Sequence, residues 1–370
     1  KGSGQIVVND RKFEDYFPTT DLRLIVEAPF KAIEAVGQYD VVAICEGGGP
    51  AGQAGALRHG ISRALIQADE NFRAVLKKAG REGLTLSFQR LDRMGAPCGF
   101  GTSGVCCRIC HMGPCRITPK HPAGICGADA DTVVARNFLR EVAGGAAAHS
   151  DHARHLVLLL KDVAEGKNPD YSLKDPAALR RAAARYGLAP EGRTDTELAL
   201  ALARRLLNEF AAQEETLSTL GLAPLKRQAL WTAQDLAPAG IDRMIVEAMH
   251  RTHIGVDHDY AHLLLHAFRT ALADGWGGSR IASIVSDILF GTPSPVRSRV
   301  NLGVLDEATV NIVVHGHEPA LAEMLAVASR DPEILDRARQ AGAAGITLAG
   351  ICCTANEILM RHGIPIAGSF

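Results

Sequence analysis

The stretch CGFGTSGVCCRICHMGPCRITPKHPAGIC, residues 98–126, holds six of the nine cysteines of this 370-residue chain. Four thiolates are enough to hold one four-iron four-sulfur cluster, and three closely spaced cysteines with a more distant fourth commonly wrap it. Spacings of three, five and eleven residues fit this pattern, and they join Cys107, Cys110, Cys115 and Cys126. Zinc is the alternative metal, although structural zinc sites favour two close pairs. Disulfides are disfavoured because disulfide frameworks belong to small secreted domains.

Cys98 and Cys106 are then left over, and two thiolates cannot complete a four-cysteine cluster by themselves. A second copy of the chain, related by a two-fold axis, would supply the other two thiolates. The shared cluster would then form part of a homodimer interface. The alternative is that both residues are inert buried thiols, since free cysteine is commonly buried.

The composition excludes several classes of protein. The chain is 47% hydrophobic and 22% charged, which fits two or three globular domains rather than a disordered protein. Its formal net charge is -1, so nothing global indicates a nucleic acid or an anionic membrane as the partner. No apolar run reaches the roughly 18 residues that span a bilayer, and no secretory signal opens the sequence. We therefore expect a cytoplasmic protein without membrane insertion.

The first part of the sequence, residues 1–85, predicts a small α+β domain. It has short alternating apolar patches in QIVVN and YDVVAIC, then a glycine-rich turn and a helical stretch from Ala54 to about Lys78. From Gly80 to Met94 the pattern lapses into a charged stretch, where we place a domain boundary.

The rest of the sequence predicts a helical domain followed by an α/β domain. We assign residues 88–295, which include the six clustered cysteines, to a helical domain. From Asp129 to about Leu289 apolar side chains recur three and four apart, which is typical of helices. In residues 296–370 the short apolar runs VNIVVHG and GITLAGI are each followed by helix-forming sequence. That alternation predicts the first part of a Rossmann-like domain with a parallel sheet.

Three histidines recur every third position in AAAHSDHARH. On a helix His149, His152 and His155 would lie roughly along one face. Imidazole titrates near neutral pH, so a row of histidines suits the transfer of protons. A solvated polar helix face is the alternative interpretation.

Two further pairs follow the predicted strands of the α/β domain. His315 and His317 come at the end of VNIVVHGH, and Cys352 and Cys353 come after GITLAGI. Ligand sites in open parallel sheets form beyond the carboxyl ends of strands, so a histidine and a cysteine from these loops could hold one metal. A strand-end turn and a small buried side chain are the structural alternatives.

Residues of about 88–370 resemble the N-terminal part of the monofunctional nickel-iron-sulfur carbon monoxide dehydrogenases. The cysteine motif carries the resemblance, which continues through AAAHSDHARH, DGWGGSRIASIVSDILFGTPSPV, VNIVVHGHEPAL and GICCTANEILMRHGIPIAGSF. The resemblance implies that Cys98 and Cys106 hold a cluster shared in a homodimer. It also implies that the next four cysteines hold an electron-transfer cluster, and that a nickel-iron-sulfur cluster forms the active site.

The resemblance assigns catalytic roles to the histidine row. His149 matches the base that assists the attack of water on carbon monoxide, and His152 and His155 match its proton exit. Asp274 is our choice for the acidic partner of this base, with Asp287 as its competitor.

The same resemblance assigns metal ligands to the two strand-end loops. A histidine of the first loop and a cysteine of the second match ligands to an iron of the nickel-iron-sulfur cluster, and we choose His317 and Cys353. The implied reaction converts carbon monoxide and water to carbon dioxide, two protons and two electrons, with a ferredoxin-like electron carrier as partner. In the family, three more cysteines and a catalytic lysine follow the region matched here. We therefore expect this chain, as given, not to assemble the nickel cluster or oxidise carbon monoxide.

The first segment resembles a different family, the bacterial ninth small-subunit ribosomal protein. GGGPAGQAGALRHGISRAL, residues 47–65, carries this resemblance, and Arg58, His59 and Arg63 are its candidate RNA contacts. Residues 1–85 contain eleven Lys or Arg against eleven Asp or Glu, so we expect weak rRNA binding. Two partial families in one chain suggest a chimeric gene or an assembly artefact. The alternative functions are a ribosomal structural protein with a foreign segment and a zinc-binding interaction module.

Overall fold

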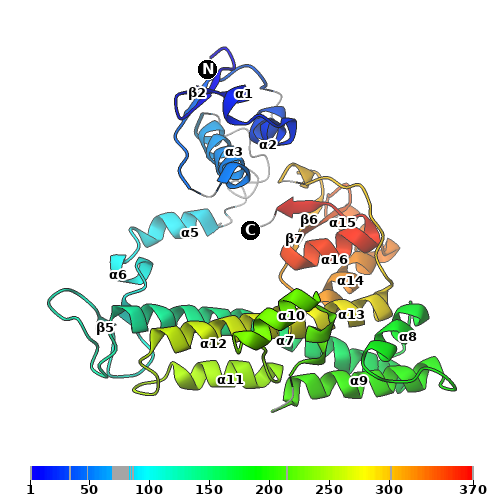
Figure 1. Ribbon diagram of the computed structural model, residues 1–370. Helices are drawn as coiled ribbons and strands as arrows, with labels where there is room; N and C mark the ends of the chain where they lie inside the picture. Colours follow the sequence, from blue (N-terminus) through cyan, green and yellow to red (C-terminus); the bar gives the residue numbers. More distant parts are fainter. Residues whose placement is uncertain are drawn as a thin grey trace. The chain divides into compact units, whose positions relative to one another are not determined.

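The computed structural model describes residues 2–32, 35–47, 49–68, 83, 85, 87–213, 216–300 and 302–368. The described chain is a mixture of helices and small sheets that divides into two compact units (Figure 1). The first unit is Lys1–Arg93 with Leu305–Asn311, and the second is Met94–Val304 with Ile312–Phe370. Among the described residues, no helix has both the length and the apolar character that crossing a bilayer requires.

The first unit packs two helices, α2 and α3, with a small sheet of strand order β2-β1-β3. β1 is antiparallel to β2 and parallel to β3. Val26 of α2 is buried together with Leu57 and Ile61 of α3, and Phe17 completes this core. The elements are β1 (Ile6–Val8), β2 (Arg11–Lys12), α1 (Phe13–Tyr16), α2 (Thr20–Ala32), β3 (Val41–Ala43), α3 (Gly49–Ala68) and α5 (Ser87–Met94).

Two sequence predictions in this unit differ from the structure. The glycine-rich stretch that we predicted as a turn before Ala54 forms the first turn of α3, which begins at Gly49. Proline at position 50 is tolerated there because the first helical N–H groups have no partner within the helix. Residues 87–94, placed in the boundary stretch, form helix α5, since they contain helix-forming Gln, Arg, Leu and Met. The predicted helix end at Lys78 lies outside the described residues.

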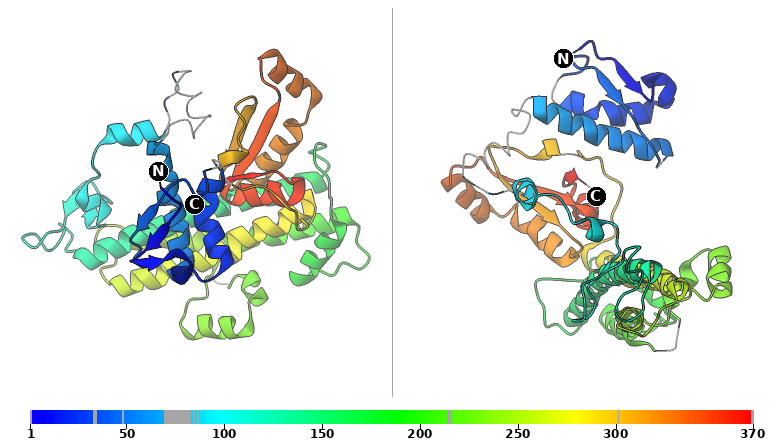
Figure 2. Two further views of the ribbon diagram at one scale, coloured as in Figure 1. Left: turned by 90° about the horizontal axis from the view of Figure 1, so that it is seen from above. Right: turned by 90° about the vertical axis from the view of Figure 1, so that its left-hand side faces the viewer.

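The second unit begins with a helical part built around one long helix, α7. Its elements are α6 (Gly99–Thr102), β4 (Cys106–Cys107), β5 (Cys115–Arg116), α7 (Ala130–Ala164), α8 (Pro176–Arg185), α9 (Asp195–Ala211), η2 (Ser218–Leu222), α10 (Leu225–Ala233), α11 (Ile241–Arg251), α12 (Tyr260–Ala273), η3 (Asp274–Gly278), α13 (Ser279–Phe290) and η4 (Leu302–Val304). α7 packs against α9, α11, α12 and α13, and Figure 2 shows α7 and α12 side by side.

The sequence of α7 explains its central place. Small and apolar side chains recur three or four residues apart and are buried, including Leu139, Ala143, Leu156 and Leu160. This spacing keeps one face of the helix turned to its neighbours. Asp129 caps the N-terminus, because its side chain accepts a hydrogen bond from the Thr132 N–H at 2.8 Å.

The last part of the second unit is a small α/β layer. Its three-stranded sheet has the order β6-β7-β8, with β7 parallel to β8. Val314 of β6 and Leu348 of β7 are buried with Ala322 and Ala326 of α14. The elements are β6 (Val310–His315), α14 (Pro319–Ala328), α15 (Pro332–Gln340), β7 (Ile346–Ile351), α16 (Cys352–His362) and β8 (Ile366–Gly368). The neighbouring strands β6 and β7 both end at loops that carry predicted metal ligands.

Candidate metal centres

Four cysteines come together beside the start of α7. β4 pairs antiparallel with β5, and this register places Cys107 opposite Cys115. Cys110 lies in the connection between the two strands, and Cys126 lies shortly before the N-cap of α7. All four are free thiols, and they line one pocket together with Arg136 and several apolar side chains. We call this site the cysteine pocket.

Two glycines allow the loops of the cysteine pocket to pack closely. A Cβ atom at Gly113 would lie 2.9 Å from the Cys107 carbonyl oxygen and 3.2 Å from the Cys115 nitrogen. A Cβ atom at Gly124 would lie 3.3 Å from Cys115 Cβ and 3.5 Å from its sulfur. A side chain at either position would crowd the thiols. Four thiols on closely packed loops fit the ligand set of a four-iron four-sulfur cluster.

Arg136 of α7 contacts one of these thiols directly. Its Nη1 lies 3.6 Å from Cys126 Sγ, and its Nη2 donates to the Asp257 carbonyl oxygen at 2.5 Å. Burial raises the pKa of the Cys126 thiol, but hydrogen bonds from the Ala128 N–H and from Arg136 outweigh burial, and the pKa is lowered. A lowered pKa favours the thiolate, which is the form that binds metal.

Cys98 and Cys106 lie outside the lining of the cysteine pocket. Cys98 is exposed at the N-terminus of α6, and Cys106 is partly buried in β4. Hydrogen bonds from the N–H groups of Gly101 and Phe100, with the charge of Arg116, lower the pKa of Cys98. The two thiols are therefore not part of that lining, and their assignment to a shared cluster stays a prediction.

A second group of possible ligands joins the helical and α/β parts of the second unit. One ligand atom each of His149, His317 and Cys353 lies within 4.8 Å of the other two. The rings of His149 and His317 are perpendicular, with centroids 4.3 Å apart. The buried Nδ1 of His317 has no hydrogen-bond partner among the described residues, which leaves it available to a ligand. We call this group the His–Cys site.

Backbone contacts hold the two loops of the His–Cys site together. The N–H and the hydroxyl of Thr354 both donate to the Gly316 carbonyl oxygen, at 3.0 and 2.6 Å. Gly350 permits this packing, because a Cβ there would lie 2.4 Å from the Ala355 Cα. Cys352 has a φ of +62°, a left-handed conformation that L residues rarely adopt. This sharp turn separates the two neighbouring thiols.

The predicted His pair and the predicted Cys pair each contribute one residue to the His–Cys site, and the other two residues contact each other. Cys352 Sγ lies 3.6 Å from His315 Nε2, whereas Cys353 lies with His317 in the His–Cys site. The structure therefore brings together the two residues that we chose as ligands, and it adds His149 to them. Their roles as ligands stay predictions.

Asp274, rather than its competitor Asp287, lies against His149. Asp274 Oδ1 is 2.6 Å from His149 Nδ1, and the Ser279 hydroxyl donates to the same carboxylate at 3.1 Å. Asp274 opens η3, a π-helical turn between α12 and α13. A Cβ at Gly278 would lie 3.1 Å from the α7 backbone at residue 150, so glycine lets this turn approach the histidine row. Asp287 instead pairs with Arg361 at 3.1 Å.

The surroundings shift the pKa values of His149, His317 and Cys353 in different directions. The hydrogen bond to Asp274 raises the pKa of His149, against the opposing effect of burial. Burial and the nearby His149 lower the pKa of His317, which favours the neutral ring that binds metal. Burial and the nearby Cys352 raise the pKa of Cys353, and a bound metal ion would reverse this effect.

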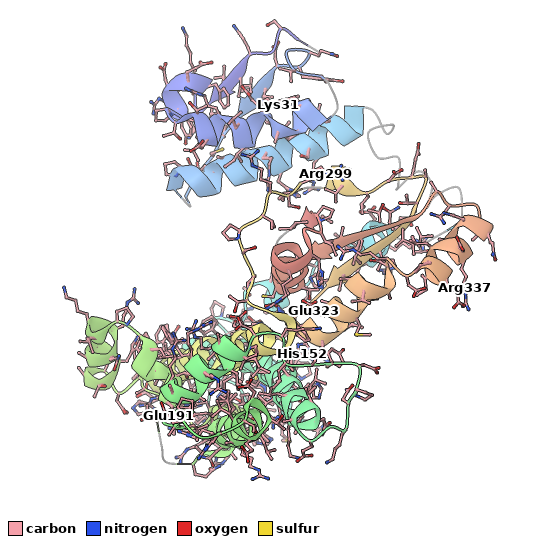
Figure 3. The ribbon with its side chains drawn as sticks, turned by 90° about the vertical axis from the view of Figure 1, so that its right-hand side faces the viewer. Lys31, His152, Glu191, Arg299, Glu323 and Arg337 are labelled. Atoms are coloured by element: carbon pink, nitrogen blue, oxygen red, sulfur yellow. The ribbon has the colours of Figure 1, made fainter. Side chains whose placement is uncertain are left out.

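The histidine row leads from the His–Cys site toward solvent. Side-chain exposure rises from 25% at His149 to 30% at His152 and 58% at His155. Glu318, the N-cap of α14, places Oε2 3.9 Å from His152 Nε2 and 3.9 Å from His155 Nδ1. Figure 3 marks His152 on α7 beside the helix α14 that carries Glu323. Our sequence analysis missed Glu318, although it directly follows the HGH motif.

The candidate RNA contacts lie on an exposed helix face in the first unit. Arg58, His59 and Arg63 of α3 are exposed, opposite the buried Leu57 and Ile61. Their role stays a prediction.

Comparison with known proteins places the chain in a family. A model of the Prismane/CO dehydrogenase family matches residues 105–370, more than half of the sequence, and the chain belongs to this family. A model of ribosomal protein S9/S16 matches residues 1–88. Both resemblances that the sequence analysis stated are thereby confirmed.

The similar proteins are carbon monoxide dehydrogenases. The chain is 54% identical to carbon monoxide dehydrogenase 1 of Methanosarcina mazei over 299 residues, 80% of this chain and 48% of that protein. It is 45% identical to carbon monoxide dehydrogenase 2 of Carboxydothermus hydrogenoformans over 305 residues, 81% of this chain and 48% of that protein. The chain thus spans about half the length of these relatives.

A solved structure shares this fold. It is the as-isolated, nickel-free carbon monoxide dehydrogenase of Thermococcus sp. AM4, produced without CooC maturase. The match has a TM-score of 0.72 and 51% identity, and it covers 79% of this chain and 47% of that one.

Proposed function

We propose that the second unit is the part of a carbon monoxide dehydrogenase that holds an electron-transfer cluster and prepares the proton-accepting side of the active site. The reaction is CO + H₂O → CO₂ + 2 H⁺ + 2 electrons, and the electrons leave through four-iron four-sulfur clusters to a ferredoxin-like carrier. A second copy of the chain shares a cluster through Cys98 and Cys106. The observation that carries the proposal is the His149–Asp274 pair lying against His317 and Cys353.

The chain's own residues account for the binding steps. Cys107, Cys110, Cys115 and Cys126 hold the electron-transfer cluster, and their pocket fits that ligand set. His317 and Cys353 would hold the nickel-iron-sulfur cluster, which supplies the site where carbon monoxide and water react and which takes up both electrons.

The proton-transfer steps fall to the histidine row. His149 accepts a proton from the attacking water, and Asp274 orients the ring and stabilises its charged form. A raised pKa suits a residue that must hold a proton before passing it on. His152 and His155, bridged by Glu318, then carry protons to the exposed end of the row.

Anaerobic reconstitution with iron and sulfide tests the cluster assignment. We expect the purified chain to turn brown, with broad visible absorbance and acid-labile sulfide in the same amount as bound iron. Zinc would give a colourless protein, so the same spectrum decides between the cluster and the zinc-binding module.

Two cysteine variants make this test specific. Cys110→Ser removes a ligand of the cysteine pocket, and we expect most of the absorbance and sulfide to disappear. Cys45→Ser is the matched control, because Cys45 is also a partly buried free thiol but lies in the first unit. Equal cluster content in both variants would contradict the assignment.

A further inference from the structure

Arg136 is a buried cation at the wall of the cysteine pocket. Its side chain lies on α7 and is 1% exposed, and it ranks first by size among the fully buried side chains of the described residues. Nη1 is directed to Cys126 Sγ at 3.6 Å, and Nη2 donates to the Asp257 carbonyl oxygen. Its buried Nε has no hydrogen-bond partner among the described residues. The guanidinium therefore contacts a thiol and a backbone carbonyl.

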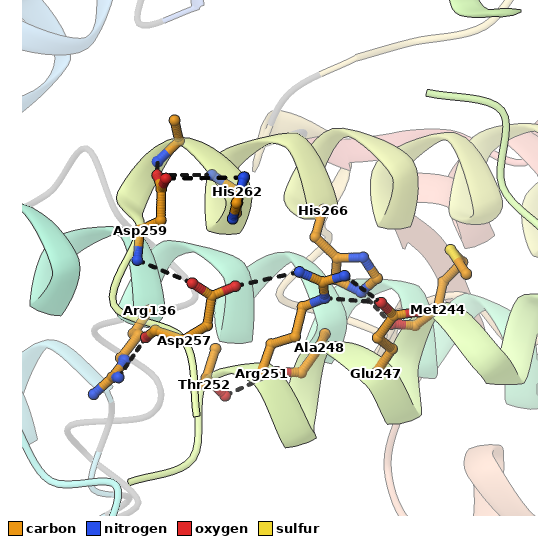
Figure 4. A network of polar contacts seen from close by, with 11 residues as sticks. Arg136, Met244, Glu247, Ala248, Arg251, Thr252, Asp257, Asp259, His262 and His266 are labelled. Atoms are coloured by element: carbon orange, nitrogen blue, oxygen red, sulfur yellow. Dashed lines mark hydrogen bonds and ion pairs between the residues drawn. The ribbon is translucent and has the colours of Figure 1, made fainter. Parts of the chain in front are cut away.

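The nearby acidic side chains pair with groups other than Arg136. The Asp257 carboxylate pairs with Arg251 at 3.2 Å and accepts the Asp259 N–H at 2.9 Å. Glu247 pairs with the same Arg251 at 2.7 Å. Figure 4 shows this network, with Arg136 joined to it through the Asp257 carbonyl. In the described part of the chain, no carboxylate lies within ion-pair distance of Arg136.

A buried charge without a counter-charge destabilises a folded protein. Removing an ion from water has a penalty of several kcal/mol even after the surroundings relax. Arginine cannot escape this penalty by losing its proton, because the guanidinium stays protonated in proteins. Arg136 therefore requires an anion at the site that it faces. The four thiolates of a bound iron-sulfur cluster, which carry net negative charge, are the group on that side of the guanidinium.

We propose that Arg136 is the counter-cation of the cluster in the cysteine pocket and raises the reduction potential of that cluster. The inference rests on the proposed cluster binding and goes beyond it. Reduction adds one negative charge to the cluster, so a cation in contact with a ligand sulfur stabilises the reduced form more than the oxidised form. Hydrogen bonds to the sulfurs and net charge are known determinants of cluster potentials. Arg136 is thus a positioning residue that acts through Cys126.

The surrounding network fixes the guanidinium rather than neutralising it. Thr132 donates to the His258 carbonyl at 2.9 Å, and Arg251 holds the Asp257 side chain. Both contacts hold the loop at residues 257–258 beside α7, so the Asp257 carbonyl points at Arg136. The guanidinium is therefore held against Cys126 before any cluster binds.

The test compares Arg136→Met with a matched variant, Arg140→Met, in the full chain. Methionine keeps much of the unbranched stem and removes the charge. Arg140 lies one helical turn along α7 and donates to the Thr252 hydroxyl at 2.7 Å, without contacting a cysteine. After anaerobic reconstitution, the midpoint potential is measured by a redox titration followed by electron paramagnetic resonance.

We expect Arg136→Met to populate the reduced cluster about tenfold less at a given potential, a shift of about 59 mV to lower potential for one electron. Arg140→Met should keep the wild-type potential. Arg136→Lys keeps the charge but loses the planar fork, and we expect its potential to lie between those of Arg136→Met and the wild type. Equal potentials in the wild type and Arg136→Met would overturn the inference.

A second measurement covers the case in which Arg136→Met does not retain a cluster. The thermal midpoint of unfolding is measured for the wild type, Arg136→Met and Arg136→Lys, before and after the same anaerobic treatment with iron and sulfide. We expect the cluster to stabilise the wild type and Arg136→Lys more than Arg136→Met, since only the first two carry the charge that the cluster neutralises. Equal stabilisation of all three would overturn the inference. A wild type that stays colourless would overturn cluster binding itself, which separates the two failures.

Discussion

The cysteine pocket and the His–Cys site differ in how the chain assembles them. The four cysteines of the cysteine pocket lie within residues 107–126, on one hairpin and the loop that follows it. The His–Cys site draws residues 149, 317 and 353 from a helix and two strand-end loops, and Asp274 joins it from a π-helical turn. A local site depends on loop geometry, whereas a dispersed site depends on packing between elements. Variants should therefore affect the two sites separately.

Removal of a ligand should have the largest effect and should affect one site at a time. We expect His317→Ala to weaken Co²⁺ binding at the His–Cys site more than about 100-fold, because even outer partners of a metal ligand contribute 10–100-fold. The iron content of the cysteine pocket should not change. Cobalt affinity is measured by visible absorbance, and His250→Ala is the control, since His250 is an exposed histidine of α11. Loss of iron in His317→Ala would show that the sites are not independent.

A smaller effect should follow when an added side chain crowds the residues that support the His–Cys site. Gly350→Ala places a Cβ against the Ala355 backbone, and we expect a loss of about 1–3 kcal/mol in the free energy of unfolding. Cobalt affinity should fall with it, because the loop carrying Cys353 must move. Gly345→Ala is the control, since a Cβ there meets nothing within 4 Å. Urea unfolding measures the free energy of unfolding of both variants, and equal stability would contradict the packing argument.

The N-cap of α7 lies beside the cysteine pocket and tests the local site. Asp129→Ala removes the bond to the Thr132 N–H, and we expect a loss of about 1 kcal/mol in the free energy of unfolding. Asp129→Asn keeps a capping oxygen and should lose much less. Chemical denaturation measures both variants. If fraying of this end lowers cobalt affinity at the His–Cys site, the difference between the two regions is smaller than we propose.

The smallest effect should come from the His149–Asp274 pair. Its side chains are each 25% exposed, so we expect Asp274→Asn to reduce stability by at most about 1 kcal/mol. The pKa of His149 is raised in the folded state, so this stabilisation is fully present below the ordinary histidine pKa of about 6.5 and is lost as pH rises through the raised value. The stability difference between wild type and variant should therefore shrink with rising pH.

Nuclear magnetic resonance of the histidine rings checks the origin of this effect. Asp274→Asn should lower the pKa of His149 toward its ordinary value. Asp287→Asn is the matched control, because Asp287 pairs with Arg361 instead. A shift of the His149 pKa in the control alone would reverse our choice of the acidic partner.

Sequence reasoning reached the candidate ligands that the structure brings together at both sites, but not the residues that support them. Cysteine spacing is visible in the sequence, because a local cluster needs its ligands close together. Arg136 was missed, since in TVVARNFLREV it is an ordinary charged residue of an amphipathic helix. Its burial depends on the loop at residue 257, far along the chain. Ser279 and Glu318 were missed for the same reason, because their roles depend on contacts with residues far along the chain.

Secondary structure was predicted well where the periodicity is long and poorly where glycine and proline interrupt it. The buried face of α7 follows directly from its repeat of small and apolar residues. The start of α3 did not, because its glycines and a proline indicate a turn in isolation, and packing of the helix against α2 outweighs that preference. The π-helical turn of η3 also had no signal beyond its glycines, whose lack of a side chain permits close approach to α7.

Helix α7 sets the spacing between the two candidate metal sites. Arg136 and His149 are thirteen residues apart on it, which is about 20 Å along the axis at 1.5 Å per residue. Inserting a single residue between them would rotate one site about 100° relative to the other, so the spacing tolerates substitution but not changes of length. The adjacent Gly144 and Gly145 lie in this interval, where an added Cβ would meet nothing within 4 Å, and they are the weakest helix formers between the two sites.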